Sequence, residues 1–400
     1  MLISSKIHNG INGEIKIPGD KSISHRSIII PSISKGISEV TNILKSDDVI
    51  HTMNAFKLMG VKIEEVKDKI IIYGRGLNSL DKPKKQIYLG NSGTSARLLL
   101  GLLASQNFIS DLSGDISLSS RPMGRIMDPL NLMGSKIDST DNKLPIRIYG
   151  QKLKPISYTV PVPSAQVKSG LILAALNTNG VTKIIEKDIT RDHTEIMLES
   201  FGADIDIKKE NKYKQISITG KKELMSKNID VPSDLSSSAF FIVACLINKN
   251  SKLTLKNINV NPSRNGILRA LKKMRAKIDI KNKRYLNNEI IADLNIEYSK
   301  LEGVELDKEM AKLMIDEYPI LSIAASFAET PSIFRGLKEL KIKESNRLEL
   351  IYQNLIRCGV SAEVKDDDLY IYPNKEYAIK DSNIITKFDH RIAMAFSIMG

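Results

Sequence analysis

Residues 90–97 read GNSGTSAR and run directly into the apolar sequence LLLGLLA. Small hydroxyl and amide side chains here precede a predicted helix whose first N–H groups have no partner within the helix. Such a loop can surround an anion with backbone donors at the positive end of a helix dipole. The same residues are typical of an ordinary helix N-cap, so the loop alone leaves both interpretations open.

A helix that ends in a turn and leads into a short strand recurs five times along the chain. The turns fall at Gly60, Gly134, Gly202, Arg275 and Gly359, about 70 to 85 residues apart. Glycine is typical of this place because it readily adopts the left-handed conformation that closes a helix. The recurrence indicates that the chain repeats one structural module.

Each module also has an earlier helix that is apolar on nearly all sides, which is typical of a helix buried in a core. These helices are predicted to start near Lys21, Gly93, Ser164, Ser233, Ile315 and Asp389. The pattern predicts an α/β (α+β) fold of βαβαββ modules, with helices inside and sheets outside. The sixth module reaches only its buried helix at Gly400, so we expect it either to continue beyond this residue or to close differently.

Six modules are expected to group in threes, with the junction at the turn VPSD of residues 231–234. We predict one domain of residues 20–231, which holds modules one to three. The other domain is predicted to hold residues 1–19 and 232–400, with modules four to six. The first strand could pair within either group, and we assign it to the second.

Composition limits the class of protein. Of its 400 residues 42% are hydrophobic, which is enough for full cores, yet no run is long enough for a membrane helix. The N-terminus lacks the order of a signal peptide, so we expect a cytoplasmic protein without a membrane partner. Cys245 and Cys358 lie far apart without CxxC spacing, which predicts reduced, structural cysteines.

The net charge of +13 comes mainly from 44 scattered lysines, so the 15 arginines are the more informative basic residues. Six of them fall in turn-like motifs: Arg26, Arg97, Arg121, Arg191, Arg347 and Arg391. Other polar residues at helix starts and turns include Lys168, His193 and His390. Because few carboxylates accompany these cations, the sequence predicts a site for ligands that carry several negative charges.

Motifs for several other chemistries are absent from the sequence. It contains no GxxxxGK[ST], no GxGxxG that opens a helix and no GxSxG. Neither HTE nor DHR has the spacing of metal ligands, so we expect no metal.

Eight motifs in order resemble those of the enolpyruvyl transferases, most closely the branch that acts on shikimate 3-phosphate. They are PGDKSISHR, SDDV, GNSGTSAR, SSRPMGR, PSAQVKSG, TRDHTE, KESNRLE and FDHRIAMAF. The resemblance implies two domains of three βαβαββ units each, joined by two crossover strands. It also implies transfer of the enolpyruvyl group of phosphoenolpyruvate to the 5-hydroxyl of shikimate 3-phosphate, with release of inorganic phosphate and without any cofactor, in the pathway to chorismate and the aromatic amino acids. The implied partners are these two small substrates, with no nucleic acid, and the protein is expected to be a monomer.

The resemblance also assigns residues to the two substrates. Shikimate 3-phosphate contacts fall on Lys21, Ser22, Arg26, Ser164, Ala165, Gln166, Asp316 and Lys343. Phosphoenolpyruvate contacts fall on Lys21, Asn91, Gly93, Arg121, Gln166, Arg347 and Arg391. Part of the family has Ser and Tyr where this chain has TRDH at residues 190–193, so Arg191 is expected to supply a charge toward shikimate 3-phosphate instead. The family's C-terminal phosphoenolpyruvate lysine has no counterpart before Gly400.

The reaction needs an acid, a base and strong anion binding, because an enol ether carbon becomes electrophilic only when its methylene is protonated. Asp316 is the candidate base at the hydroxyl and Glu344 the candidate proton donor to the methylene, although their roles could be exchanged. Lys21 is expected to steady the charge of a tetrahedral intermediate, and the two halves to close on the ligands.

Two other functions stay open at this stage. An enolpyruvyl transferase for UDP-N-acetylglucosamine would carry a loop cysteine near residues 119–121, where this chain has none. An RNA-binding protein, or a relative of the similarly modular RNA phosphate cyclases, would need aromatic stacking platforms, but Trp is absent and only 5% of residues are aromatic.

Overall fold

The computed structural model describes residues 9–210, 213–373 and 382–400. The chain forms two compact units. The N-terminal unit comprises Gly19–Pro232 with Leu286–Glu289, and the C-terminal unit comprises the chain up to Pro18, Ser233–Tyr285 and Ile290–Gly400. The divisions after Pro18 and Pro232 lie one residue from the predicted ones, and the additional segment 286–289 contains the turn of a hairpin.

The N-terminal unit contains three modules, each with a four-stranded sheet. The first is formed by α1 (Lys21–Ser32), β2 (Lys35–Thr41), α2 (Asp47–Leu58), β3 (Lys62–Val66), β4 (Lys69–Arg75) and β13 (Ile229–Asp230). The second is formed by β5 (Ile87–Tyr88), α3 (Gly93–Ala104), β6 (Ile109–Ser113), α4 (Ile116–Ser120), α5 (Gly124–Leu132), β7 (Lys136–Thr140) and β8 (Lys143–Tyr149). The third is formed by β9 (Ser157–Val160), α6 (Ala165–Leu176), β10 (Val181–Glu186), α7 (His193–Ser200), β11 (Asp204–Glu210) and β12 (Tyr213–Thr219).

The C-terminal unit contains two further four-stranded sheets. One module is formed by β1 (Asn12–Ile15), α8 (Leu235–Ile247), β14 (Lys252–Asn259), α9 (Gly266–Lys273), β15 (Lys277–Leu286) and β16 (Glu289–Glu297). The next is formed by β17 (Glu305–Leu306), α10 (Lys308–Met314), α11 (Tyr318–Ser326), β18 (Ser332–Phe334), the 3₁₀ helix η1 (Lys338–Ile342), α12 (Arg347–Arg357), β19 (Ser361–Lys365) and β20 (Asp368–Tyr372). Of the sixth module, the described residues contain the buried helix α13 (His390–Met399).

All five sheets share one topology, in which the first strand of the module lies parallel to the second and the order is first, second, fourth, third. Two modules obtain their first strand from a distant part of the chain. The strand β1 pairs with β14, so the N-terminal strand belongs to the C-terminal unit. The strand β13, which follows module three, pairs with β2 of module one. These exchanges explain how the chain crosses between units twice.

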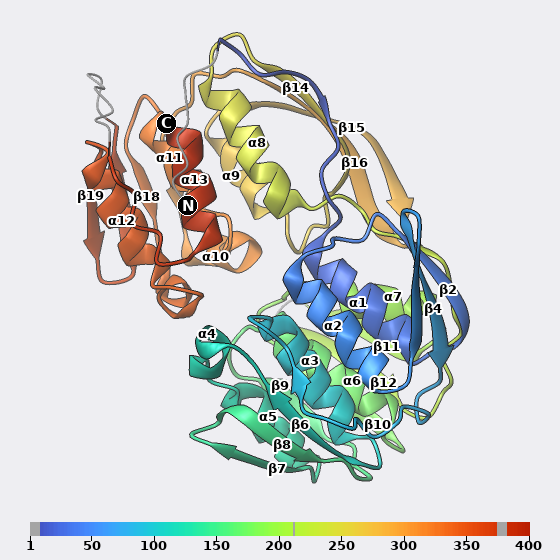
Figure 1. Ribbon diagram of the computed structural model, residues 1–400. Helices are drawn as coiled ribbons and strands as arrows, with labels where there is room; N and C mark the ends of the chain where they lie inside the picture. The colour runs from blue at the N-terminus through green and yellow to red at the C-terminus, as the bar shows by residue number, and fades with distance from the viewer. Residues whose placement is uncertain (1–8, 211–212, 374–381) are drawn as a thin grey trace. The chain divides into compact units, whose positions relative to one another are not determined.

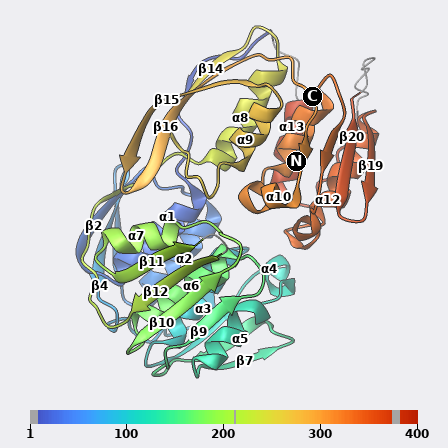
Figure 2. The ribbon, with the colours of Figure 1, turned by 180° about the vertical axis from the view of Figure 1, so that it is seen from behind.

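Helices α1, α3 and α6 form the inner layer of the N-terminal unit, with the sheets around them (Figures 1 and 2). Their side chains are buried along nearly the whole helix, and they contribute to one continuous core. Helices α8, α11 and α13 contribute to a separate core in the C-terminal unit. The prediction of buried helices inside and sheets outside is therefore confirmed.

The five predicted turns after the second helix of each module are also confirmed. Each turn residue has a positive φ, including +81° at Gly60 and +81° at Gly359. Arg275 takes the same conformation with φ +61°, although its Cβ makes this conformation costly by about 1–2 kcal/mol. The module geometry therefore requires a left-handed residue here even where the sequence supplies no glycine.

The start predicted at Ile315 is wrong by three residues, because a short helix, α10, ends at Met314 and α11 begins at Tyr318. Pro319 explains the break. A continuous helix through this residue would lack one N–H donor and would press the proline ring against the carbonyl four residues earlier, whereas proline fits the first turn of a new helix. Asp316 therefore lies in a turn between two helices and is not the first residue of a buried helix.

Replacing Gly101 with Ala should destabilise the N-terminal unit strongly. Helices α3 and α6 pack so closely that a Cβ at Gly101 would lie 1.9 Å from the carbonyl oxygen of Gly170. We expect a loss of about 3 kcal/mol in the free energy of unfolding, measured by urea titration, because overpacking displaces backbone here. Gly134→Ala is the control, since nothing lies within 4 Å of its Cβ and only the strain at φ +91° should appear, about 1 kcal/mol. Equal effects would show that the helices can move apart.

Candidate active site

The N-terminus of α1 carries three of the predicted substrate residues. Asp20 caps the helix, its Oδ1 accepting from the backbone N–H of Ile23 at 2.9 Å, so Lys21 and Ser22 stand in the first turn. Lys21 forms an ion pair with Asp48 of α2. Its side chain is 37% exposed, which leaves the ammonium group accessible to solvent and ligand.

Arg26 lies one turn further along α1 and is almost fully buried. Its Nε donates to Thr194 Oγ1 at 2.6 Å, and its Nη2 donates to Ser169 Oγ at 2.9 Å. Burial lowers the pKa of Arg26 to about 10, partly opposed by the nearby carboxylate of Glu195. The guanidinium therefore ties α1 to α6 and α7, and its charge is retained at neutral pH.

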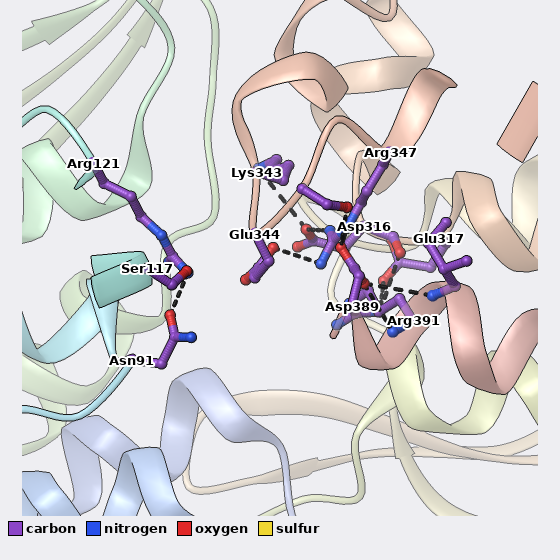
Figure 3. A network of polar contacts seen from close by, with 12 residues as sticks. Asn91, Ser117, Arg121, Asp316, Glu317, Lys343, Glu344, Arg347, Asp389 and Arg391 are labelled. Carbon is purple, nitrogen blue, oxygen red and sulfur yellow. Dashed lines mark hydrogen bonds and ion pairs between the residues drawn. The ribbon is translucent and has the colours of Figure 1, made fainter. Parts of the chain in front are cut away.

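The loop at residues 90–97 acts as an N-cap, because Ser92 Oγ accepts from the backbone N–H of Ser95 at 3.2 Å. Capping does not exclude anion binding, since two guanidinium groups approach the same loop. A Cβ at Gly93 would lie 2.9 Å from Arg97 Nη1 and 3.3 Å from Arg121 Nη1. Arg121 also donates to the side-chain oxygen of Asn91, and at 3.3 Å to Ser117 Oγ (Figure 3).

Gln166 joins this group from the first turn of α6. Its Oε1 accepts from Arg97 Nη1 at 2.8 Å, and its Nε2 donates to Thr94 Oγ1 at 3.0 Å. Burial and the neighbouring charges of Arg121 and Arg125 lower the pKa of Arg97 to about 10. The structure thus brings together Asn91, Gly93, Arg121 and Gln166, and it gathers positive charge around them.

The start of α6 and the segment before α7 hold the remaining predicted residues of this unit. Ser164 caps α6 by accepting from the N–H of Val167 at 3.3 Å, and Ala165 is the first helical residue. Arg191 is half-buried two residues before α7. His193 is buried and its Nδ1 lies 2.6 Å from Glu289 Oε1, so the structure gives this histidine a structural partner.

Lys168 does not join the anion-binding side chains predicted at the helix starts. It is fully buried and its Nζ lies 3.0 Å from Glu186 and 2.8 Å from Glu195. Glu195 also accepts from Lys214 at 2.8 Å. These four residues form an internal charge network, which the sequence alone did not reveal because helical spacing cannot show which polar residue points inward.

Arg347, the first residue of α12, is the centre of the site in the C-terminal unit (Figure 3). It is 1% exposed and contacts three carboxylates. Its Nη2 lies 2.6 Å from Glu344, its Nη1 3.2 Å from Asp316 and its Nε 2.8 Å from Asp389. Burial opposes its charge, but these carboxylates outweigh burial and raise the pKa of Arg347.

Asp389 is a member of this group that the sequence analysis missed. It caps α13 through Oδ1, while Oδ2 accepts from Arg347 Nε and, at 2.9 Å, from Ser345 Oγ. Burial opposes its ionisation, but the charge of Arg347 and these hydrogen bonds lower the pKa of Asp389. The available signal was an aspartate directly before a buried helix, which predicts a cap but not a partner on another helix.

The other predicted residues of the C-terminal unit lie around Asp316. Lys343 Nζ lies 3.8 Å from Asp316 Oδ1. Arg391 Nη1 donates to the backbone oxygen of Asp316 at 3.1 Å and lies 3.8 Å from the buried carboxylate of Glu317. The unit therefore places Asp316, Lys343, Glu344, Arg347 and Arg391 in one group of alternating charge (Figure 3).

This group combines carboxylates for proton transfer with cations for anion binding. Asp316 and Glu344 have side chains that are 20% and 29% exposed, so both can reach a ligand. Arg347 and Asp389 are buried beside them and hold them in place. Over residues 9–210, 213–373 and 382–400, no group of three or more His, Cys, Asp or Glu side chains is placed to hold a metal ion. Both cysteines are free and buried, as predicted.

Comparison with known proteins first identifies the fold. The chain superposes on the enolpyruvyl transferase NikO from Streptomyces tendae with a TM-score of 0.75 over 99% of this chain and 89% of that one. At 16% identity this likeness concerns the fold alone. It confirms the predicted two-domain enolpyruvyl transferase fold.

The pattern of the EPSP synthase (3-phosphoshikimate 1-carboxyvinyltransferase) family matches residues 6–400. A 3-phosphoshikimate 1-carboxyvinyltransferase of Vesicomyosocius okutanii is 46% identical over 391 residues, 98% of this chain and 89% of the relative. The EPSP synthase of Acinetobacter baumannii is 41% identical and gives a TM-score of 0.88, covering 99% of this chain and 91% of that structure. The chain belongs to the EPSP synthase family.

Membership confirms the predicted enzyme class, a transferase of the shikimate pathway that uses phosphoenolpyruvate and shikimate 3-phosphate. It also decides against the alternative of a UDP-N-acetylglucosamine enolpyruvyl transferase. Within the part of the chain that the structure describes, no helix is long and apolar enough to cross a membrane.

Proposed function

We propose that two groups of side chains carry out the enolpyruvyl transfer in this chain, one in each unit. The observation that supports this proposal is the cluster around the buried Arg347, where two accessible carboxylates lie beside three cations, Arg347 itself, Lys343 and Arg391. A purely anion-binding protein has no use for carboxylates beside its cations, since they repel the ligand. A transferase needs them for proton transfer.

In the N-terminal unit, we assign shikimate 3-phosphate to the starts of α1 and α6 and to the segment before α7. The residues are Lys21, Ser22, Arg26, Ser164, Ala165, Gln166 and Arg191. The loop before α3 is assigned to phosphoenolpyruvate through Asn91, Gly93 and Arg121, with Gln166 and Lys21 also contributing. Helix N-termini and guanidinium groups both favour phosphate and carboxylate oxygens.

In the C-terminal unit, Asp316 and Lys343 are assigned to shikimate 3-phosphate, and Arg347 and Arg391 to phosphoenolpyruvate. Glu344 delivers a proton to the methylene carbon of phosphoenolpyruvate, which makes C2 electrophilic. The 5-hydroxyl oxygen then attacks C2 while Asp316 takes the hydroxyl proton. Lys21 balances the charge of the resulting tetrahedral adduct.

The adduct collapses when the C–O bond to phosphate breaks. The methyl group returns a proton to Glu344 as the double bond forms again, and the proton held by Asp316 leaves with the phosphate. Both carboxylates therefore end the cycle in their starting states, so the reaction requires no cofactor.

We further propose that the enzyme acts in the cytoplasm as a monomer. We also propose that it binds no nucleic acid, because its lysines are scattered and few of its residues are aromatic.

Replacing Arg121 with Ala tests the assignment of the α3 loop. We expect the KM for phosphoenolpyruvate to rise roughly 10- to 150-fold, because a charge-assisted contact contributes about 1.5–3 kcal/mol. Binding of shikimate 3-phosphate alone, measured by calorimetry, should stay nearly unchanged. Arg147→Ala is the control, since Arg147 is exposed on β8 and pairs with Asp111 at 2.7 Å. Equal losses for both substrates would mean that Arg121 only holds its turn together.

A further inference from the structure

A chain of buried polar side chains joins three helices of the N-terminal unit. His25 Nδ1 of α1 lies 2.8 Å from Thr52 Oγ1 of α2. Thr52 Oγ1 lies 2.5 Å from Ser95 Oγ of α3, and Ser95 Oγ lies 2.6 Å from Ser92 Oγ, the cap of α3. All four residues are at most 1% exposed. The chain therefore runs from the helix that begins with Lys21 to the loop that contains Asn91 and Gly93.

The hydrogen atoms of this chain can be placed by counting donors. Thr52 Oγ1 lies 3.1 Å from the backbone oxygen of Asp48, which only accepts, so the threonine hydroxyl donates there. Thr52 must then accept from both His25 Nδ1–H and the hydroxyl of Ser95. Ser95 in turn accepts from the hydroxyl of Ser92, which accepts from the backbone N–H of Ser95.

We assign the tautomer of His25 from this arrangement, in which Nδ1 also lies 3.4 Å from Ser95 Oγ. The proton is assigned to Nδ1, which leaves Nε2 as an acceptor that is buried without a hydrogen-bond partner among the described residues. Burial and the charge of Lys21 lower the pKa of His25 to about 3, so the ring stays neutral. A neutral ring with one fixed donor is a rigid connection, because it neither titrates nor changes tautomer without losing a buried hydrogen bond.

The other end of the chain leads to Lys21. Asp48, whose backbone oxygen receives the threonine hydroxyl, also forms the ion pair with Lys21 through its side chain. Thr52 therefore sits between the partner of the candidate catalytic lysine and the cap of the phosphoenolpyruvate loop. A shift of α1 or of α3 against α2 would break at least one short buried hydrogen bond.

We propose that His25, Thr52 and Ser95 are positioning residues that set the loop of Asn91 and Gly93 relative to Lys21. They touch no substrate, and their role rests on the proposed function, in which that loop and Lys21 bind phosphoenolpyruvate. Their effect should therefore appear in the binding of this substrate more than in shikimate 3-phosphate binding or in the chemical step.

Ser95→Ala and Thr52→Val, alone and combined, test this proposal. Each single variant should raise the KM for phosphoenolpyruvate roughly tenfold, as expected for the loss of connected buried hydrogen bonds, with kcat within about twofold. The double variant should also lose only roughly tenfold, because either change already breaks the chain. Additive losses, or equal losses for both substrates, would overturn the proposal.

Ser27→Ala is the matched control, since Ser27 is equally buried in α1 but its hydroxyl only donates to the backbone oxygen of Ile23 at 2.9 Å. It should leave the KM for phosphoenolpyruvate unchanged. If it raises this KM as much as Ser95→Ala does, the effect is general loosening of the core and the positioning role is wrong.

A spectroscopic measurement tests this chain of hydrogen bonds in the absence of substrate. A ¹⁵N–¹H correlation spectrum of the imidazole in the whole protein should show His25 protonated at Nδ1 and not at Nε2, unchanged from pH 5 to 8. In Thr52→Val this pattern should be lost. A ring protonated at Nε2 would rule out the proposed chain of hydrogen bonds. An unmodified protein that is inactive but gives the expected spectrum would contradict the proposed function instead.

Discussion

Asp316→Asn and Glu344→Gln should each lower kcat by about 10²–10⁴-fold, the range for a lost general acid or base. Substrate affinity should stay the same or increase, because Asp316→Asn removes a negative charge where anions bind and Glu344→Gln introduces none. The polar amides keep the shape of the group around Arg347, which retains its buried contact with Asp389. Turnover is followed by phosphate release, and affinity by calorimetric titration of each substrate.

Glu349→Gln is the control for both carboxylate variants. Glu349 lies on α12 two residues after Arg347, and its Oε1 accepts from Gln353 at 2.7 Å. Its replacement should leave kcat within about twofold, as expected for a partly buried polar contact outside the reaction. Near-normal turnover in Asp316→Asn or Glu344→Gln would remove that residue from the mechanism and make Lys21 the leading proton-transfer group.

The largest expected effect on stability is that of Glu195→Gln in the internal charge network. The change leaves two buried ammonium groups, Lys168 and Lys214, without the carboxylate they share at 2.8 Å. We expect a loss of about 3–5 kcal/mol in the free energy of unfolding, as for other broken buried ion pairs. Glu297→Gln is the control, because its pair with Lys252 is exposed and should contribute at most about 1 kcal/mol.

The stabilisation that Glu195 contributes should depend on pH in a defined direction. Burial opposes the charge of Glu195, but Lys168 and Lys214 outweigh burial and lower its pKa from 4.5 to about 2. Its stabilisation is therefore complete above pH 4.5 and is lost as the pH falls from 4.5 toward 2. Urea unfolding should show the difference between wild type and Glu195→Gln shrinking over that interval. A difference independent of pH would contradict the role of the ionised carboxylate.

Most of the fold could be predicted because its signals are local. Helix starts follow caps such as Ser164, and turns follow residues such as Gly60, whose place is taken by glycine in three further modules. The exceptions have local causes as well. Pro319 moves the start of α11 to Tyr318, and Arg275 takes a conformation normally reserved for glycine.

The site could be predicted only in part, because sequence motifs name side chains but not their neighbours. Arg347 and Glu344 are three residues apart, a spacing typical of exposed ion pairs, yet Arg347 is buried among three carboxylates from different segments. Asp389 and Glu195 stand in the recognised motifs DHR and TRDHTE, but their importance comes from partners on other helices. Such long-range pairings leave no periodic signal in one sequence.

The central claim is that this chain transfers an enolpyruvyl group to shikimate 3-phosphate. It is tested most directly by incubating the purified protein with phosphoenolpyruvate and either shikimate 3-phosphate or UDP-N-acetylglucosamine, and then measuring phosphate and the mass of the organic product. We predict one phosphate released per enolpyruvyl ether formed on shikimate 3-phosphate, without added cofactor, and no product from UDP-N-acetylglucosamine. Product from UDP-N-acetylglucosamine alone, or phosphate release without an enolpyruvyl ether, would contradict the account.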